Sequence, residues 1–380
     1  MSTGPTSPPA AGTEQLPLAR AINLGLRHAL ERDPKVLLMG EDIGALGGVF
    51  RVTDGLLKDF GASRVVDTPL AESGIVGTAI GMAMAGYRPV VEIQFDGFVF
   101  PAFDQITTQL AKMSYRSRGA VQVPVVIRIP YGGGIGAVEH HSESPEALFA
   151  HTPGLRVISP ATAGDAYAMI QDAIACPDPV IFFEPKARYW EKGPVRVRPP
   201  GRTGPGGQDV GTEQSGPGGQ DLGTEQSGPG AHSAQDEQPP SVFDPGAIQN
   251  ATVVREGTDI TLAGYGPTMR TIVAAAQAAQ EEGTSAEVID LRSVSPLDID
   301  TVATSVRKTG RLVVVHEAPT YFGAGAELAA SISAECFYHL QAPVLRVGGF
   351  HTPYPVANLE EDYLPDLDRV MHAIDDSLSH

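Results

Sequence analysis

Two glutamates occupy positions where a carboxylate is costly. Glu72 opens a segment of small and apolar residues, and no charged residue follows between Gly74 and Tyr87. Glu41 directly follows the apolar run "KVLLMG". A buried carboxylate needs a partner, and one that exchanges its proton can act as an acid or a base. A glutamate at a helix start can also be no more than a favourable N-terminal charge. From the residues alone, both interpretations of Glu72 stay open.

Two adjacent histidines follow a glycine-rich stretch. The run "YGGGIGAVEHHSESPEALF" begins at Tyr131 and carries His140 and His141. Its glycines superficially match a dinucleotide-binding fingerprint, but such a fingerprint opens directly into a helix, and here Pro145 marks the helix start. We therefore expect a loop whose histidines act as general acid or base. A surface histidine pair is the alternative, and a metal site lacks a supporting pattern such as HExxH.

An aromatic cluster and several missing motifs narrow the chemistry. Four phenylalanines lie between Phe95 and Phe103, and one that faces a pocket would stack on a flat heteroaromatic cofactor. The chain lacks a P-loop, a GxSxG nucleophile elbow and the GDG-with-downstream-Asn pattern that holds a magnesium diphosphate in thiamine enzymes. The nearest strings, "TDGLL" and "FDGFV", lack the first glycine. The sequence thus offers acid, base and stacking groups without a diphosphate motif.

Apolar strands that alternate with helices must position these side chains. The runs "KVLLMG", "RVVDT", "RPVVEIQF", "PVVIRIP", "LRVIS" and "PVIFFEP" are separated by helical stretches such as "PAFDQITTQLAKMSYR" and "AGDAYAMIQDAIA". This alternation predicts a mainly parallel sheet with helices on both faces. Sites in such sheets form beyond the carboxyl ends of the strands, where Glu41 and Glu72 fall.

The chain divides into four parts. We expect a disordered tail over 1–15, an α/β domain over 16–190, a linker over 191–246 and a smaller α/β domain over 247–380. The linker contains "GPGGQDVGTEQS" followed by a nearly identical copy, and this Gly, Pro and polar composition cannot bury a core.

A stripe of small residues runs along the segment after Glu72. Gly74, Gly77, Gly81 and Ala85 share one helical face. Close packing within the fold is the favoured interpretation, and a subunit contact is the alternative.

The composition excludes several classes of function. The chain has 380 residues, with 27 basic and 45 acidic ones for a net charge of −18, which opposes nucleic-acid binding. Its two cysteines, Cys176 and Cys336, form no CxxC, so a cytoplasmic location is the simplest expectation. We expect neither a secretory signal at the start nor a membrane span.

Taken together, the motifs resemble the beta subunit of the decarboxylating component of 2-oxo acid dehydrogenase complexes. The matching strings include "GEDIGALGGVFRVTDGL", "DTPLAESGIVGTAIGMA", "EIQFDGFVFPAFDQI", "HHSESPEALFAHTPGLRV", "EVIDLRSVSPLDIDT" and "TGRLVVVHEAP". The match runs from about Leu16 to Pro365 apart from the Gly/Pro insert. "FFEPK" and "SPEALFAHTPG" are more similar to branched-chain members than to pyruvate members. The resemblance implies a pyrimidine-binding domain followed by a transketolase C-terminal-like domain.

The resemblance gives Glu72 a role. The matching glutamate in the family hydrogen-bonds a pyrimidine nitrogen of thiamine diphosphate and helps to activate the cofactor, which then serves as electron sink for loss of carbon dioxide. Residues that match Glu41, Leu70, Gln94 and Phe98 line the aminopyrimidine end of the cofactor. Phe98 departs from branched-chain members, which carry Tyr, so stacking is kept while a hydroxyl hydrogen bond is lost.

The same resemblance implies roles for a loop histidine and an ion. His141 matches the histidine that assists acyl transfer to a lipoyl arm, and His140 is at most a supporting neighbour. Relatives bind structural potassium near the segment that matches "AIACPDP", where Ala173, Cys176 and Asp178 fall at ligand positions. Cys176 replaces an Asp there, and this departure weakens the match.

The missing diphosphate motif implies a partner. In two-chain members the alpha subunit carries the magnesium–diphosphate motif, so the resemblance implies a heterotetramer of two alpha and two beta chains, with a lipoylated acyltransferase as acyl acceptor. Three alternatives stay open: an acetoin-type or transketolase-like thiamine enzyme, a non-catalytic assembly subunit, and a nicotinamide-dependent dehydrogenase that rests only on the discounted glycine match.

Overall fold

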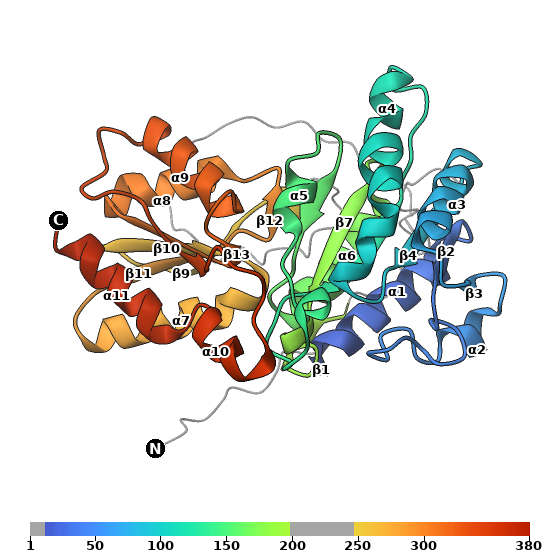
Figure 1. Cartoon of the computed structure of the whole chain (residues 1–380), viewed down its shortest axis with the longest axis horizontal. Coiled ribbons are helices and arrows are strands. Elements are labelled where there is room, and N and C mark those ends of the chain that lie inside the picture. Colours follow the sequence, from blue (N-terminus) through green and yellow to red (C-terminus); the bar gives the residue numbers. More distant parts are fainter. Residues whose placement is uncertain (1–11, 198–246) are drawn as a thin grey trace, which may run out of the picture.

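The computed structural model describes residues 12–197 and 247–380. These residues form two α/β domains that lie side by side (Figure 1). The repeats of the expected linker lie outside the described residues.

The first domain is built on a seven-stranded sheet with the order β12-β6-β7-β5-β4-β2-β3, parallel except for β12. Its own strands are β2 (Val36–Gly40), β3 (Val65–Asp67), β4 (Arg88–Glu92), β5 (Val126–Tyr131), β6 (Arg156–Ile158) and β7 (Val180–Pro185). The helices are α1 (Leu18–Arg32), α2 (Leu56–Phe60), α3 (Glu72–Met84), α4 (Met113–Arg116), α5 (Glu146–Ala150) and α6 (Ala163–Ala175).

Both faces of this sheet are covered, as the apolar strands predict. Leu37 and Met39 of β2 belong to the same apolar cluster as the buried face of α3. Val36 and Leu38, which point the opposite way, join the cluster formed with α1 and α6. The expected mainly parallel, helix-covered sheet is therefore confirmed.

The second domain is built on a five-stranded sheet with the order β14-β13-β10-β11-β9, in which only β9 is antiparallel. Its strands are β9 (Thr252–Arg255), β10 (Ile260–Gly264), β11 (Ala286–Asp290), β13 (Leu312–Pro319) and β14 (Leu345–Gly349). The helices are α7 (Met269–Glu281), α8 (Ile299–Thr309), α9 (Ala324–Glu335), α10 (Glu360–Tyr363) and α11 (Leu367–Leu378).

The domains share a strand and a core. β12 (Ser293–Ser295) belongs by sequence to the second domain but pairs antiparallel with β6 of the first sheet. One apolar cluster contains Val91 of the first domain together with Val314 of the second. The two domains are thus packed through a continuous core, and each can position residues of the other.

Two local expectations need correction. The tail expected to end at residue 15 already contains β1 (Thr13–Pro17), and the linker expected from residue 191 begins with β8 (Lys192–Arg196). The two segments pair with each other as an antiparallel ribbon, a contact between distant segments that no local pattern signals. The helical stretch expected from "PAFDQITTQLAKMSYR" is confirmed, but its hydrogen bonding changes between 3₁₀, π and α spacing along a stretch that contains β-branched residues of low helix propensity.

A buried arginine ties three strands of the first sheet together. Arg128 on β5 is 2% exposed and lies between Glu92 of β4 and Glu184 of β7. Its Nη1 is 2.5 Å from Glu92 Oε2, and its Nε is 2.6 Å from Glu184 Oε1. The Tyr189 hydroxyl donates a further hydrogen bond of 2.5 Å to Glu184. Because no other cation within residues 12–197 and 247–380 pairs with these carboxylates, their charges depend on Arg128.

We predict that Arg128→Met lowers the free energy of unfolding by about 3–5 kcal/mol, because it leaves two buried carboxylates unpaired. Arg156→Met is the matched control: Arg156 pairs with Asp178 in a partly exposed position, and its loss should cost under about 1 kcal/mol. Chemical denaturation followed by circular dichroism measures both. Equal losses for the two variants would contradict the assignment of Arg128 as a structural anchor.

Candidate functional site

Glu41 and Glu72 converge at the carboxyl ends of neighbouring strands. Glu41 follows β2, and Glu72 is the first residue of α3, which follows β3. They are 6% and 8% exposed. Glu41 Oε1 is buried and has no hydrogen-bond partner among the described residues. Burial raises the pKa of Glu41, and the negative charges of Glu72 and Asp42 raise it further. These effects favour the protonated form of Glu41 more than in an exposed glutamate.

The turn after Glu41 is held by side chains from adjacent strands. Asp42 has a left-handed backbone with φ of 59°. Gln94, just after β4, donates from Nε2 to Asp42 Oδ2 at 3.1 Å. Asp67 at the end of β3 accepts hydrogen bonds from the backbone N–H groups of Gly44 and Ala45. Side chains from β3 and from the end of β4 therefore fix the path of the chain after β2 and so the position of Glu41. Gln94 lies at the same edge of the sheet.

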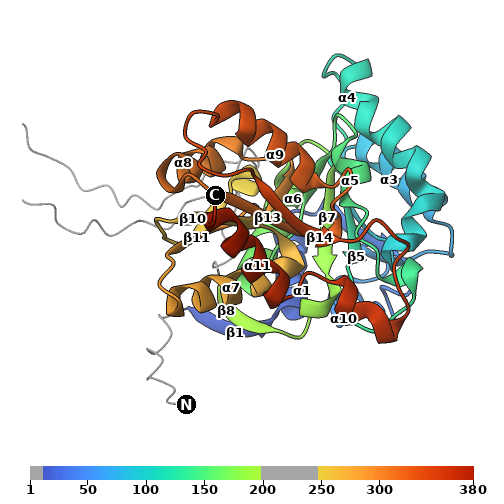
Figure 2. The same cartoon turned by 60° about the vertical axis from the view of Figure 1, so that its left-hand side comes forward.

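Leu70 and α3 form an exposed edge beside the two glutamates. The Leu70 side chain is 80% exposed and that of Met84 is 54% exposed. Gly74, Gly81 and Ala85 are exposed as well, whereas Gly77 is only partly covered. The favoured expectation that this stripe packs within the fold is therefore wrong for the chain alone. Figures 1 and 2 place α3 and α4 at the side of the molecule remote from the second domain.

His141 lies against an aromatic surface. It ends a 3₁₀ turn formed by residues Glu139–His141, and its ring centroid is 4.1 Å from that of Phe95 and 5.2 Å from that of Phe98. Its Nδ1 is buried without a partner among the described residues. Burial lowers the pKa of His141, and the neighbouring His140 lowers it further. The ring is therefore predominantly neutral at pH 7 and able to accept a proton.

A buried ion pair positions the histidine turn. Lys186 Nζ lies 2.6 Å from Asp96 Oδ1, and both side chains are fully buried. The other oxygen, Asp96 Oδ2, accepts a hydrogen bond of 2.9 Å from the backbone N–H of Glu143. Next to Asp96, Gly97 approaches the turn so closely that a Cβ there would come 2.5 Å from the carbonyl oxygen of His140. Sequence patterns missed Asp96 and Lys186, because their partners are distant along the chain.

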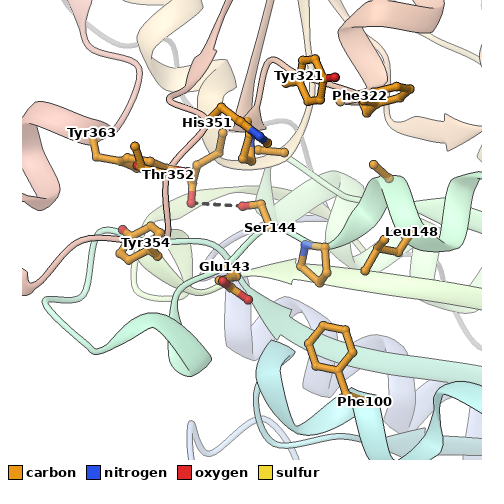
Figure 3. A pocket seen from close by; sticks show the side chains of 16 residues that line it. Phe100, Glu143, Ser144, Leu148, Tyr321, Phe322, His351, Thr352, Tyr354 and Tyr363 are labelled. Atoms are coloured by element: carbon orange, nitrogen blue, oxygen red, sulfur yellow. Dashed lines mark hydrogen bonds between the residues drawn. The ribbon is translucent and has the colours of Figure 1, made fainter.

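Carboxylates of the second domain reach the same loop. Glu317 accepts a hydrogen bond from the N–H of Gly133, and Glu360 accepts bonds of 3.0 Å from the N–H groups of Gly134 and Gly136. Ser144 Oγ lies 3.4 Å from Glu317, the bond drawn from Ser144 in Figure 3. Sequence reasoning also missed Glu317 and Glu360.

A pocket of about 260 Å³ lies between the two domains beside this loop. Phe100, Ser144 and Leu148 line it from the first domain, and Tyr321 and His351 line it from the second (Figure 3). The pocket shows that the domain boundary and the histidine loop share one region of the molecule.

The residues expected to hold potassium already have protein partners, and a potassium site there stays a prediction. Arg88 Nη1 donates to the carbonyls at the end of α6, including that of Cys176 at 3.4 Å. The Asp178 carboxylate pairs with Arg156 at 2.8 Å, and the Ala173 carbonyl accepts the N–H of Cys176. A guanidinium at these carbonyls repels a second cation. Among the described residues no cluster of three or more His, Cys, Asp or Glu is placed to hold a metal ion.

Two protein-family models match this chain and define the class of its domains. Residues 14–191 match the family model "Transketolase, pyrimidine binding domain", and residues 249–370 match "Transketolase, C-terminal domain". The fold is also similar to that of a solved split-gene transketolase, described as an inactive beta4 tetramer, with a TM-score of 0.67 over 96% of this chain and 99% of that one at 21% identity.

Closer relatives then define the family. The pyruvate dehydrogenase E1 component subunit beta of Leifsonia xyli is 54% identical, over 98% of this chain and 97% of that protein. The 3-methyl-2-oxobutanoate dehydrogenase subunit beta of Mycobacterium tuberculosis is 47% identical, over 96% and 92%. The 2-oxoisovalerate dehydrogenase subunit beta of Pseudomonas aeruginosa is 42% identical, over 93% and 92%. The chain therefore belongs to the family of beta subunits of 2-oxo acid dehydrogenase first components.

Within residues 12–197 and 247–380 no helix is suited to cross a bilayer.

We predict that Gly97→Ala displaces the histidine turn, because the added Cβ would also lie 2.7 Å from His140 Cα. His141 should then leave Phe95 and Phe98, become more exposed and react faster with diethyl pyrocarbonate. Gly81→Ala is the control, since no atom lies within 4 Å of a Cβ built there. Mass spectrometry of the modified peptide measures the rate. An unchanged rate in Gly97→Ala would refute the proposed contact.

Burial of Glu146 makes the stability of the fold depend on pH. Glu146 is fully buried, accepts a 2.6 Å hydrogen bond from the Tyr265 hydroxyl, and burial raises its pKa to about 8. The native protein then binds this proton more tightly than the unfolded chain does. The free energy of unfolding therefore falls as the pH rises from about 4.5 to 8. The loss is at most about 1.4 kcal/mol for each unit of difference between the two pKa values.

Glu146→Gln keeps an acceptor for Tyr265 but carries no charge. We expect its melting temperature to fall less than that of the wild type between pH 5 and pH 8. Glu31→Gln, an exposed change on α1, should leave the wild-type profile intact. Parallel profiles for wild type and Glu146→Gln would show that Glu146 does not titrate in this range.

Proposed function

We propose that this chain is the beta subunit of a thiamine diphosphate-dependent 2-oxo acid dehydrogenase. In this role it takes part in oxidative decarboxylation of a 2-oxo acid and in transfer of the acyl group to the lipoyl arm of an acyltransferase. The names of its relatives support this reaction class. The structural observation that carries the proposal is Glu41 Oε1, which is buried without a hydrogen-bond partner among the described residues, next to Glu72 at the carboxyl ends of the strands.

The residues present fit the aminopyrimidine end of the cofactor. When bound, thiamine diphosphate supplies a nucleophilic carbon and an electron sink for loss of carbon dioxide. Glu72 would hold the proton shared with a pyrimidine nitrogen, and Glu41 would offer its unpartnered oxygen to the same ring. Leu70, Gln94 and Phe98 would line the ring on its other sides. Because Leu70 is so exposed, a second chain must cover this edge to exclude water.

His141 is proposed to assist acyl transfer. Its neutral ring and its placement on Phe95 and Phe98 suit a group that takes up or gives a proton at a fixed position. His140 lies beside it with ring centroids 4.4 Å apart and has at most a supporting role. This assignment separates two tasks: Glu72 serves the decarboxylation half-reaction, and His141 serves the transfer half-reaction.

The proposal requires partners. The chain lacks the diphosphate motif, so we propose that an alpha subunit supplies the magnesium–diphosphate site and that two copies of each chain form a heterotetramer in the cytoplasm. The exposed stripe on α3, next to the two glutamates, suits the alpha contact. The acyl acceptor would be a lipoylated acyltransferase. The strings "FFEPK" and "SPEALFAHTPG" favour a branched-chain substrate, and kcat/KM for branched-chain acids against pyruvate measures the preference.

We predict that Glu72→Gln, assembled with the alpha subunit, reduces decarboxylation by at least about 100-fold, because an amide cannot share the proton with the cofactor. Reduction of a dye by the 2-oxo acid measures this half-reaction without the acyltransferase. Glu281→Gln, the same change at the end of α7, is the control and should be fully active. Unchanged dye reduction in Glu72→Gln would support a non-catalytic assembly subunit instead.

A further inference from the structure

The glycine-rich loop before the histidines has the geometry of an anion-binding nest. Gly132, Gly134 and Gly136 have φ of 82°, 84° and 67°, in alternation with residues of ordinary φ. Such alternation turns successive N–H groups toward one side, where they form a concave site for an anion. In Gly-rich loops of this kind the anion is often a phosphate. Here the concave side is already filled by the chain itself.

The filling groups are two carboxylates of the second domain. Glu317, on β13, accepts the N–H of Gly133, and Glu360, at the start of α10, accepts those of Gly134 and Gly136. Both are 7% exposed. The Tyr354 hydroxyl, 2.7 Å from Glu360 Oε1, fixes that carboxylate in turn. A Cβ at Gly133 would lie 1.8 Å from the same hydroxyl, so the loop and the second domain are in close contact.

The loop transmits this contact to the histidine turn. The loop has a glycine limb, residues 132–136, and a second limb that ends at Glu143. The two limbs are joined where the N–H of Gly132 donates to the carbonyl of Glu143 at 3.0 Å. The turn containing His140 and His141 lies between these limbs. On one side the Asp96–Lys186 pair holds Glu143, and on the other the two carboxylates hold the glycines. Release of the glycines would leave the turn held through Glu143 and through the ring contacts of His141 with Phe95 and Phe98.

We propose that Glu360, together with Glu317, is a positioning residue for His141: the second domain sets the histidine turn through carboxylates bound in the glycine nest. The part played by His141 rests on the proposed function. A purely structural role at the domain interface would affect both half-reactions alike. A positioning role affects acyl transfer and leaves decarboxylation unchanged.

The test is Glu360→Gln in the assembled complex. Glutamine keeps one oxygen for Gly134 but turns an NH₂ donor toward the N–H of Gly136, so one bond of the nest is lost. Glu361→Gln is the matched control, because Glu361 is the adjacent, exposed residue of the same helix. The readouts are the rate of acylation of a free lipoyl domain, dye reduction, and amide hydrogen exchange of residues 132–143.

The proposal predicts a fall in lipoyl acylation of about 10- to 100-fold with dye reduction unchanged, since a displaced catalytic group loses rate steeply. Amide exchange over 132–143 should accelerate in Glu360→Gln alone. Equal loss in both half-reactions, or no change in acylation, would overturn the proposal. Tyr354→Phe removes only the hydroxyl that holds Glu360, so it should change the same readouts in the same direction but by less. This second variant keeps the test decisive if Glu360→Gln does not fold.

Failure of the proposed function has a different signature. A wild-type complex that decarboxylates no 2-oxo acid would remove the catalytic role of His141. The positioning claim is then decided by exchange over 132–143 and by the rate of His141 modification with diethyl pyrocarbonate: faster in Glu360→Gln than in Glu361→Gln supports it, and equal rates overturn it.

Discussion

The buried pair of Lys186 and Asp96 is the interaction on which the arrangement of the site depends. Both side chains are fully buried, and each has its pKa moved by burial toward the neutral form: that of Asp96 is raised and that of Lys186 is lowered. Such a pair is a weak source of net stability, because desolvation offsets the Coulomb attraction. The pair instead fixes the positions of the segments that it joins. Asp96 belongs to the aromatic segment and holds Glu143, so Phe95, Phe98 and the histidine turn are located by one contact.

The other residues of the site are positioned by the first sheet and by the second domain. The parallel sheet delivers Glu41 and Glu72 to one edge, and residues on adjacent strand ends fix the turns that carry them. The second domain shares a core with the first and supplies Glu317 and Glu360 to the opposite side of the histidine loop. The two domains therefore form one positioning frame. We propose that this frame presents one half of a cofactor-binding site, with an exposed edge at Leu70 and α3.

Local patterns in the sequence predicted the sheet, the helices and three principal candidates. Glu41, Glu72 and the pair His140 and His141 stand out because each departs from its immediate surroundings: a carboxylate after an apolar strand, a carboxylate before an uncharged helix, and histidines in a glycine-rich loop. The choice of His141 within the pair came from the family resemblance. The groups that hold them could not be found in this way. Lys186 is 90 residues from Asp96, and Glu317 is 184 residues from Gly133. The ribbon between β1 and β8, and the arginine at the expected potassium site, depend on tertiary contacts of the same kind.

We propose that this chain contributes the aminopyrimidine half of a site completed by another subunit. The most direct measurement is to tag the chain in its native cell and to identify the proteins that co-purify with it in equal amount. We expect a partner of matching abundance that carries a GDG motif with a downstream asparagine, in a complex that binds thiamine diphosphate. Recovery of this chain only as a homo-oligomer, with no such partner, would contradict it.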